Sequence, residues 1–319
     1  MERLVNGRVK WAGRRLTAPP PAPTTRRAFM SSVASALRLS KTAIVINLTL
    51  AVVKIAAGLL GNSYVLVADG IESLADVFSS FVVWAALRLS TLPADANHPF
   101  GHGKAEPIAS IMVSLALLGA ALLIAVQSVR EIRAPQDPPQ QFTLLVLVVV
   151  IVIKELLFRR VAKAGAALGS TALRADAWHH RSDALTSAAA FLGILIALVG
   201  GPGYEAADDW AALLACGIIA WNGLHLLRGS MDEIMDASVA PEIVQQVRRL
   251  AAEVEGVKEI EKCRIRKSGL HLTLDIHVVV DGELSVREGH AIAHNVVAKL
   301  RGSQHHINDV TVHIEPDRK

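Results

Sequence analysis

The sequence predicts a polytopic α-helical membrane protein, in which six transmembrane helices are followed by a small α+β domain. The 319-residue chain is 52% hydrophobic and only 19% charged, which is too apolar for an ordinary soluble protein. Runs that could cross a bilayer, which takes about 20 helical residues, recur six times. After Asp236 the composition changes to that of a soluble domain.

The six apolar runs suggest a topology as well as a helix count. The predicted spans cover about residues 42–60, 64–88, 107–129, 141–158, 172–199 and 207–228. Arg and Lys crowd the N-terminus and follow the second, fourth and sixth spans, so both termini are expected in the cytoplasm and the protein in the inner (plasma) membrane. Arg130 and Arg133, after the third span, depart from this rule.

The chain divides into three predicted regions. Residues 1–37 are expected to be a disordered basic N-terminal tail, residues 38–232 the six-helix transmembrane domain, and residues 233–319 a cytoplasmic α+β metal-binding and dimerisation domain. Residues 25–30 superficially fit a twin-arginine export signal. The apolar run that follows is only the first of several, so we interpret these arginines as juxtamembrane anchors rather than a nucleic-acid-binding tail.

The last 80 or so residues have an αββαβ order. Helical spacing over Pro241–Val254 precedes a strand pair at Val257–Arg266 and Leu270–Val280, then a helix at 285–301 and a strand at Ile307–Glu315. This order suits a two-layer, ferredoxin-like or metallochaperone-like domain. Strand alternation points His277, His313 and Glu315 outward, where they could bind metal.

Two stretches inside apolar segments share one polar template. They read Ala68-Asp69-x-x-Glu72-x-x-x-Asp76 and Ala175-Asp176-x-x-His179-x-x-x-Asp183. Offsets of 0, 3 and 7 place the polar groups of each stretch on one helix face. Ionisable groups in a membrane helix are expensive and mark ion paths, and two i, i+4 pairs can supply a tetrahedral cation with four ligands. The predicted cage is Glu72, Asp76, His179 and Asp183.

Purely structural roles are also possible for some of these residues. A single buried Asp–His pair is more often a structural hydrogen bond, but two such pairs in separate spans favour a metal site. Asp69 and Asp176 are interpreted as helix-packing or proton-relay groups. Lys54, Lys154 and Glu155 are interpreted as packing partners or interface groups rather than ligands.

The ligand types narrow the substrate. One imidazole with three carboxylates suits Zn²⁺, Fe²⁺, Co²⁺ or Cd²⁺, and His179 favours zinc over manganese. An empty cage with three carboxylates in a low dielectric must take up protons, so metal and protons compete for the same atoms. This predicts proton-coupled antiport rather than a pore.

The loop after the second predicted span holds another cluster. Asp95, His98 and His102 have spacing suitable for a zinc-type site, although an ordinary polar loop is an equal alternative.

Three motifs together resemble those of the cation diffusion facilitator family, over about residues 38–316. They are the stretch 66–76, the stretch 98–106 (His98-Pro99-Phe100-Gly101-His102-Gly103-Lys104-Ala105-Glu106) and His179-His180-Arg181-Ser182-Asp183. The resemblance implies a homodimer with six membrane helices, a cytoplasmic metal-binding domain and metal-for-proton exchange, most similar to the bacterial zinc/iron branch. Zn²⁺ or another divalent metal is then expected as substrate and as a structural or regulatory ion, with membrane lipid but no nucleic acid as a partner.

The resemblance also implies residue roles. It assigns the transport site to Glu72, Asp76, His179 and Asp183, the loop site to Asp95, His98 and His102, an inter-subunit charge interlock to Lys104 and Asp236, and cytoplasmic ligands to His277, His313 and, more loosely, His290. Glu72 stands where this branch more often has Asp, Glu261 where it often has His, and Glu315 where it has Asp. Cys263 could join the cytoplasmic site.

Two other functions could use residues of these kinds. An intramembrane metallohydrolase would need an open metal position for water, yet the chain lacks the HExxH motif and the four ligands leave no such position. A membrane-anchored metal sensor would keep its function when Asp76 and Asp183 are replaced. We therefore expect a transporter and not an enzyme.

Overall fold

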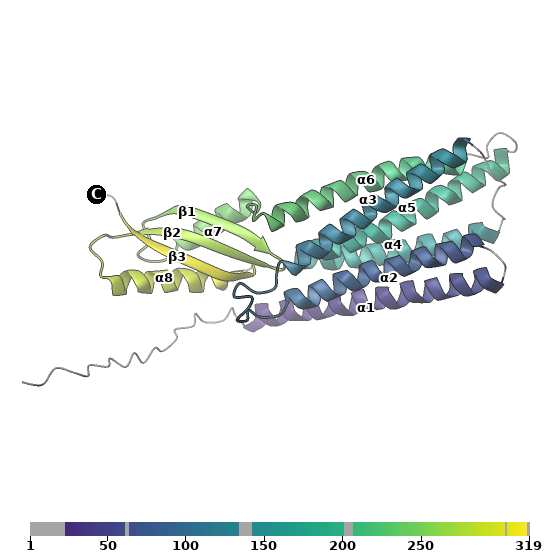
Figure 1. Cartoon of the computed structure of the whole chain (residues 1–319). Helices are drawn as coiled ribbons and strands as arrows, with labels where there is room; N and C mark the ends of the chain where they lie inside the picture. The colour runs from purple at the N-terminus through teal and green to yellow at the C-terminus, as the bar shows by residue number, and fades with distance from the viewer. Residues whose placement is uncertain (1–22, 61–63, 134–141, 201–206, 304, 318–319) are drawn as a thin grey trace, which may run out of the picture.

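The protein, seen here in a computed structural model, is a bundle of six long helices with a small αβ domain at one end (Figure 1). The structure describes residues 23–60, 64–133, 142–200, 207–303 and 305–317. The bundle helices are α1 (Pro23–Leu60), α2 (Tyr64–Ser90), α3 (Ala105–Arg133), α4 (Phe142–Leu168), α5 (Thr171–Gly200) and α6 (Ala207–Ile234).

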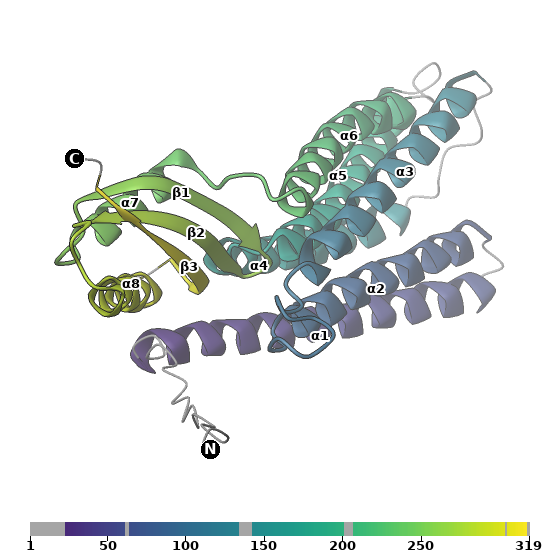
Figure 2. The same ribbon diagram turned by 60° about the vertical axis from the view of Figure 1, so that its left-hand side comes forward.

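The bundle is built from closely packed helix pairs. Helix α1 packs along α2, α4 along α5, and α3 along α6, and α5 also contacts α3 and α6 (Figure 2). Many buried residues at these contacts are small, among them Ala36, Ala43, Ala109 and Ala172. Small side chains let helix backbones approach closely, which is the usual basis of helix association in a bilayer. Outward faces carry exposed large apolar residues such as Leu123 and Trp221.

Three of these helices have segments long and apolar enough to cross a membrane among the described residues. The segments are Phe29–Val53, Ala105–Arg133 and Asp209–Ile234. Helices α2, α4 and α5 complete the six-helix bundle.

Helix α1 corrects one prediction. It begins at Pro23, so residues 23–37 are helical and not disordered; residues 1–22 of the predicted tail lie outside the described residues. Packing explains the difference. Val33 and Ala36 are buried in the same apolar cluster as Leu87 and Val161, and this burial stabilises a helix that composition alone does not reveal.

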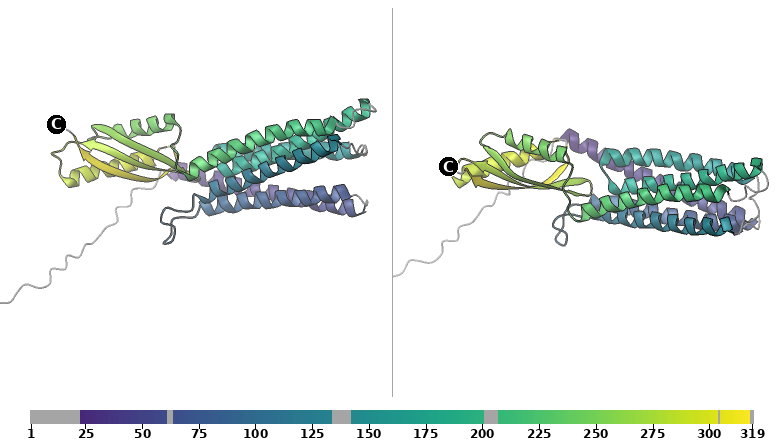
Figure 3. Two further views of the ribbon diagram at one scale, coloured as in Figure 1. Left: turned by 45° about the horizontal axis from the view of Figure 1, so that its top comes forward. Right: turned by 90° about the horizontal axis from the view of Figure 1, so that it is seen from above.

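The C-terminal domain has the predicted αββαβ order and lies at one end of the helical bundle (Figure 3). Its elements are α7 (Pro241–Ala252), β1 (Glu259–Ser268), β2 (His271–Val280), α8 (Val286–Arg301) and β3 (Ile307–Pro316). The sheet order is β1-β2-β3, with β1 antiparallel and β3 parallel to β2.

The two faces of this sheet differ as the alternation predicts. Leu274, Ile276 and Val278 of β2 are buried with Val247 of α7 and Val296 of α8, so both helices cover one face. His277 lies opposite His313 in the β2–β3 register, on the other face. A capping box between Ser285 and Glu288 fixes the start of α8.

Candidate metal sites

The predicted membrane site forms between α2 and α5. Asp76, His179 and Asp183 each place a ligand atom within 4.8 Å of the others. Nε2 of His179 lies 2.9 Å from Oδ1 of Asp76. The backbone of Glu72 lies one helical turn before Asp76 on α2, but its side chain, like that of Asp69, lies outside the described part of the structure.

A cation supplied by α4 also enters this cluster. The ammonium of Lys154 donates to Oδ2 of Asp76 at 2.8 Å and to Oδ2 of Asp183 at 2.7 Å. Lys154 is only 3% exposed. Lys154 was expected to be a packing or interface group, but its ammonium lies between two of the candidate ligands. A signal was present in the sequence, because an ionisable group inside an apolar span marks a functional site by default.

Asp176 lies one turn before His179, in a second polar layer. It is fully buried, and its Oδ1 accepts a hydrogen bond from Ser80 Oγ at 3.2 Å. Nε2 of His180 lies 3.8 Å from Oδ2 of Asp176 and is also fully buried. The hydrogen bond from Ser80 links α2 to α5 and agrees with the packing role expected of Asp176.

Arg181 points away from the cluster toward aromatic rings. Its guanidinium lies 4.4 Å from the ring centroid of Phe158 and 5.5 Å from that of Trp178. Cation–π contacts of this kind hold a cation without a carboxylate partner. Arg181 therefore leaves the carboxylates of the site to Lys154 and His179.

The α2–α3 loop brings its predicted ligands together. Asp95, His98 and His102 form a group whose ligand atoms lie within 4.8 Å of one another. Asp95 reaches Nδ1 of His98 at 3.2 Å and Nε2 of His102 at 3.4 Å. The backbone N–H of His98 also donates to Asp95, and this hydrogen bond is the main reason that the pKa of the Asp95 carboxyl lies below its ordinary value. An ionised carboxylate beside two imidazoles is a competent cation site.

A third group lies on the open face of the C-terminal sheet. His277 and Glu315 are joined by a 2.5 Å contact, and Nε2 of His313 lies 3.8 Å from the same Glu315 oxygen. The pKa of Glu315 lies below its ordinary value, first because Glu261 hydrogen-bonds to it and then because His277 does. Glu261 therefore stands beside this group, as the resemblance implies.

Two other predicted cytoplasmic ligands lie elsewhere. His290 of α8 does not belong to the His277–His313–Glu315 group; its Nε2 lies 3.0 Å from Nε2 of His294. Cys263 packs against the apolar core of the domain, and burial raises the pKa of its thiol. A buried thiol of raised pKa is a poor metal ligand, so within one chain Cys263 does not join the site.

Lys104 and Asp236 form an ion pair within a single chain, whereas the resemblance implies an interlock between subunits. Nζ of Lys104 lies 2.5 Å from Oδ1 of Asp236 and 2.6 Å from the carbonyl oxygen of Glu233. The hydrogen bond from Lys104 is the main cause that holds the pKa of Asp236 below its ordinary value. The pair connects the start of α3 to the segment that follows α6.

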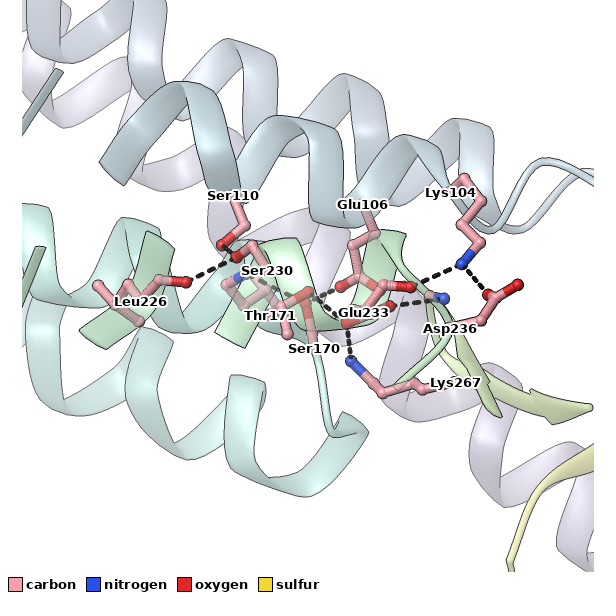
Figure 4. A network of polar contacts seen from close by, with 12 residues as sticks. Lys104, Glu106, Ser110, Ser170, Thr171, Leu226, Ser230, Glu233, Asp236 and Lys267 are labelled. Carbon is pink, nitrogen blue, oxygen red and sulfur yellow. Dashed lines mark hydrogen bonds and ion pairs between the residues drawn. The ribbon is translucent and has the colours of Figure 1, made fainter. Parts of the chain in front are cut away.

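The same contact belongs to a larger network that sequence reasoning missed (Figure 4). Oε1 of Glu233 accepts from the backbone N–H of Gly269 at 3.0 Å, and Oε2 lies 2.8 Å from Nζ of Lys267. Glu106, fully buried in the first turn of α3, hydrogen-bonds to Ser170. The network ties α3, α5 and α6 to the β1–β2 turn of the C-terminal domain. Its only sequence signal is a set of charges at helix ends.

Comparison with known proteins identifies the family. Residues 40–235 match the model of the cation efflux transmembrane domain, and residues 239–317 match that of the cation efflux protein cytoplasmic domain. The chain belongs to the cation diffusion facilitator family. It is accordingly a membrane-integral metal efflux transporter and not an enzyme.

Several relatives match over most of their length. The manganese efflux system protein MneP of Bacillus subtilis is 32% identical over 86% of this chain and 94% of its own. The magnetosome protein MamB of Magnetospirillum gryphiswaldense is 33% identical over 81% and 86%, and the cation-efflux pump FieF of Shewanella oneidensis is 29% identical over 87% and 93%. A solved structure of the MamM C-terminal domain is 29% identical, covering 25% of this chain and 100% of its own, with a TM-score of 0.24.

Proposed function

We propose that this transporter exports a divalent metal, zinc in preference, in exchange for protons. The substrate would bind between α2 and α5 on Asp76, His179 and Asp183, with Glu72 as fourth ligand. The observation that carries the proposal is the convergence of three ligand atoms within 4.8 Å from two helices of the bundle. Carboxylate and imidazole ligands at that spacing suit a tetrahedral dication.

The ligand set supports zinc over other dications. Imidazole suits zinc, copper and iron, whereas manganese is more at home among oxygen ligands. The name of the relative MneP makes manganese the second candidate, since that protein is described as a manganese efflux system. The presence of His179 beside Asp76 favours zinc.

Proton exchange follows from the same atoms. Asp76 and Asp183 lie close together inside an apolar bundle. Carboxylates that lack a counter-charge are costly there. When metal leaves, these oxygens need another cation or a proton, so metal release and proton binding are linked. A pH gradient would then drive metal movement.

We propose that all six bundle helices cross the inner membrane, with both termini in the cytoplasm, and that the protein is a homodimer. The basic residues at the start of α1 and toward the ends of α2, α4 and α6 support this orientation, and the match to the cation efflux cytoplasmic domain supports dimerisation. In the dimer, Lys104 and Asp236 would lie near the subunit boundary, and the loop and sheet groups would bind structural or regulatory metal.

Transport into inverted membrane vesicles tests the function. Zinc, iron and manganese uptake is measured with an imposed pH gradient in the wild type and in Asp76→Ala and Asp183→Ala. We expect both variants to lose transport, while Asp275→Ala, an exposed carboxylate of β2, serves as the control and keeps it. Full uptake in Asp76→Ala would refute the site, and uptake indifferent to the pH gradient would refute antiport.

A further inference from the structure

The Lys154 ammonium lies where a metal substrate would have to bind. It bridges one carboxylate oxygen from α2 and one from α5, at 2.8 Å from Asp76 and 2.7 Å from Asp183. The other oxygen of Asp76 is held by Nε2 of His179 at 2.9 Å. The three described side chains of the candidate transport site, Asp76, His179 and Asp183, are thus held in one cluster with Lys154.

These contacts and metal binding exclude each other. A zinc ion bound to these same two oxygens at about 2.0–2.2 Å would overlap the ammonium nitrogen, which lies 2.8 Å and 2.7 Å from them. An ammonium has donors but no acceptor, so it cannot share the metal as a ligand. A dication and an ammonium between the same two carboxylates would also repel each other strongly in a medium of low dielectric.

We propose that Lys154 is a tethered competitor for the transported metal. It occupies the site when metal is absent and must leave before a dication binds. This inference rests on the proposed function and deepens it, because it names a residue that regulates occupancy of the transport site. Lys154 sits on α4, whereas the metal ligands come from α2 and α5, so exchange of ammonium for metal also changes how α4 is held.

Competition of this kind has two consequences. First, it places one positive charge between the two carboxylates of the empty transporter. This charge offsets one of their two negative charges, so the cost of the empty site inside the bundle is smaller, while the remaining charge still links metal release to proton binding. Second, it favours divalent over monovalent cations. A monovalent ion that replaces the ammonium brings the same single positive charge, so its attraction to the two carboxylates is no stronger. A dication brings one more positive charge and is attracted more strongly.

The first test is the metal concentration that gives half-maximal transport. If Lys154 occupies the site about nine-tenths of the time, its removal should lower that concentration about tenfold, because apparent affinity scales with the fraction of competent sites. The variants are Lys154→Met, Lys154→Gln, which keeps a hydrogen-bond donor, and Lys154→Arg, which keeps the charge. Lys163→Met, an exposed lysine on the same helix, is the matched control.

The expected order is specific. Lys154→Met and Lys154→Gln should both lower the half-saturating concentration of Zn²⁺ and Mn²⁺, and Lys154→Arg should keep it near the wild-type value. A half-saturating concentration that is unchanged or higher in both neutral variants would overturn the proposal, because a residue that only held the helices together would not compete with metal.

A second measurement needs no variant, which covers the case in which the neutral variants do not fold. Purified full-length protein is treated at fixed pH with a membrane-permeant amine-acylating reagent, and Lys154 modification is quantified by mass spectrometry. Addition of Zn²⁺ should increase modification several-fold by expelling the ammonium, whereas Mg²⁺, which strips its waters reluctantly, should change it little. No increase with Zn²⁺ at saturating concentration would contradict the proposal.

The two levels can fail separately. If Asp76→Ala and Asp183→Ala transport metal at the wild-type rate, the proposed site is wrong whatever Lys154 does. A different result would contradict only the role of Lys154. In that case Asp76→Ala and Asp183→Ala lose transport, Lys154→Met leaves the half-saturating concentration unchanged, and Zn²⁺ does not increase acylation of Lys154 in the wild type.

Discussion

The carboxylate of Glu233, in the last turns of α6, accepts a hydrogen bond from the backbone amide of Gly269 at 3.0 Å. The other oxygen of the same carboxylate lies 2.8 Å from Nζ of Lys267. These contacts bind the end of the helical bundle to the β1–β2 turn of the C-terminal domain. A buried carboxylate therefore connects the two domains, beside the apolar contact that Leu270 makes with the core of the bundle.

Replacing Glu233 should cost much more stability than replacing Asp236. The Glu233 side chain is 4% exposed and its loss leaves a buried amide and an ammonium without their partner, at about 2–3 kcal/mol. The Asp236 side chain is 40% exposed, and exposed ion pairs contribute about 1 kcal/mol or less. Thermal melting of Glu233→Ala and Asp236→Ala in detergent checks the difference. Equal shifts in melting temperature would show that the network does not depend on burial.

Gly103 and Gly269 should tolerate no side chain, because the loop and the turn touch there. A Cβ on Gly103 would lie 2.6 Å from the carbonyl oxygen of Ser268, and one on Gly269, where φ is +61°, would lie 2.7 Å from the carbonyl oxygen of Gly103. We expect Gly103→Ala and Gly269→Ala to destabilise the protein by about 1–3 kcal/mol.

Gly229 of α6 provides the control for those two variants. A Cβ there meets nothing within 4 Å, so Gly229→Ala should leave the melting temperature unchanged or raise it slightly, since Ala favours a helix. If Gly229→Ala is as unstable as Gly269→Ala, the close approach of loop and turn is not the cause.

His179→Asp should relax the preference for zinc. The change replaces the only imidazole of the candidate cage with a carboxylate, which suits manganese better. We expect zinc transport to fall by on the order of tenfold while manganese transport is kept, as loss of even indirect support for a metal ligand costs 10–100-fold. The ratio of zinc to manganese uptake in loaded vesicles is the measurement. An unchanged ratio would count against His179 as the selectivity determinant.

Acidification should weaken the contact between α1 and the C-terminal domain. The centroid of the Phe29 ring lies 5.3 Å from that of the His271 ring, and burial lowers the pKa of His271 below its ordinary value. The folded protein thus disfavours protonation. The stabilisation from neutral His271 is fully present above pH 6.5 and is lost as the pH falls toward the lower pKa of the folded state.

Melting temperatures between pH 7.5 and pH 5.5, measured with a chelator present, test this linkage. The wild type should lose more stability on acidification than His271→Gln, which has no titrating ring. His290→Gln, an exposed histidine of α8, should behave like the wild type. A pH dependence that survives intact in His271→Gln would assign it to other groups.

Elements with a strong periodic signal could be predicted from the sequence. The C-terminal order and its two faces were predicted correctly because alternation in Leu270–Val280 distinguishes core from surface directly. The beginning of α1 could not be predicted in the same way. Residues 23–37 have a composition typical of disorder, and they become helical because Val33 and Ala36 are buried against other helices.

The sequence by itself determined the chemistry of the chain. Two matched stretches in apolar helices name Asp76, His179 and Asp183, since helical spacing places their side chains on one face. Only the tertiary structure decided which other charge meets them. Lys154 comes from a different helix, 78 positions from Asp76 along the chain, and no local pattern records that α4 packs along α5. Likewise, Glu233 meets Gly269 only because the C-terminal domain folds back on the end of the bundle. Periodicity shows which face a residue occupies, and packing selects what lies opposite it.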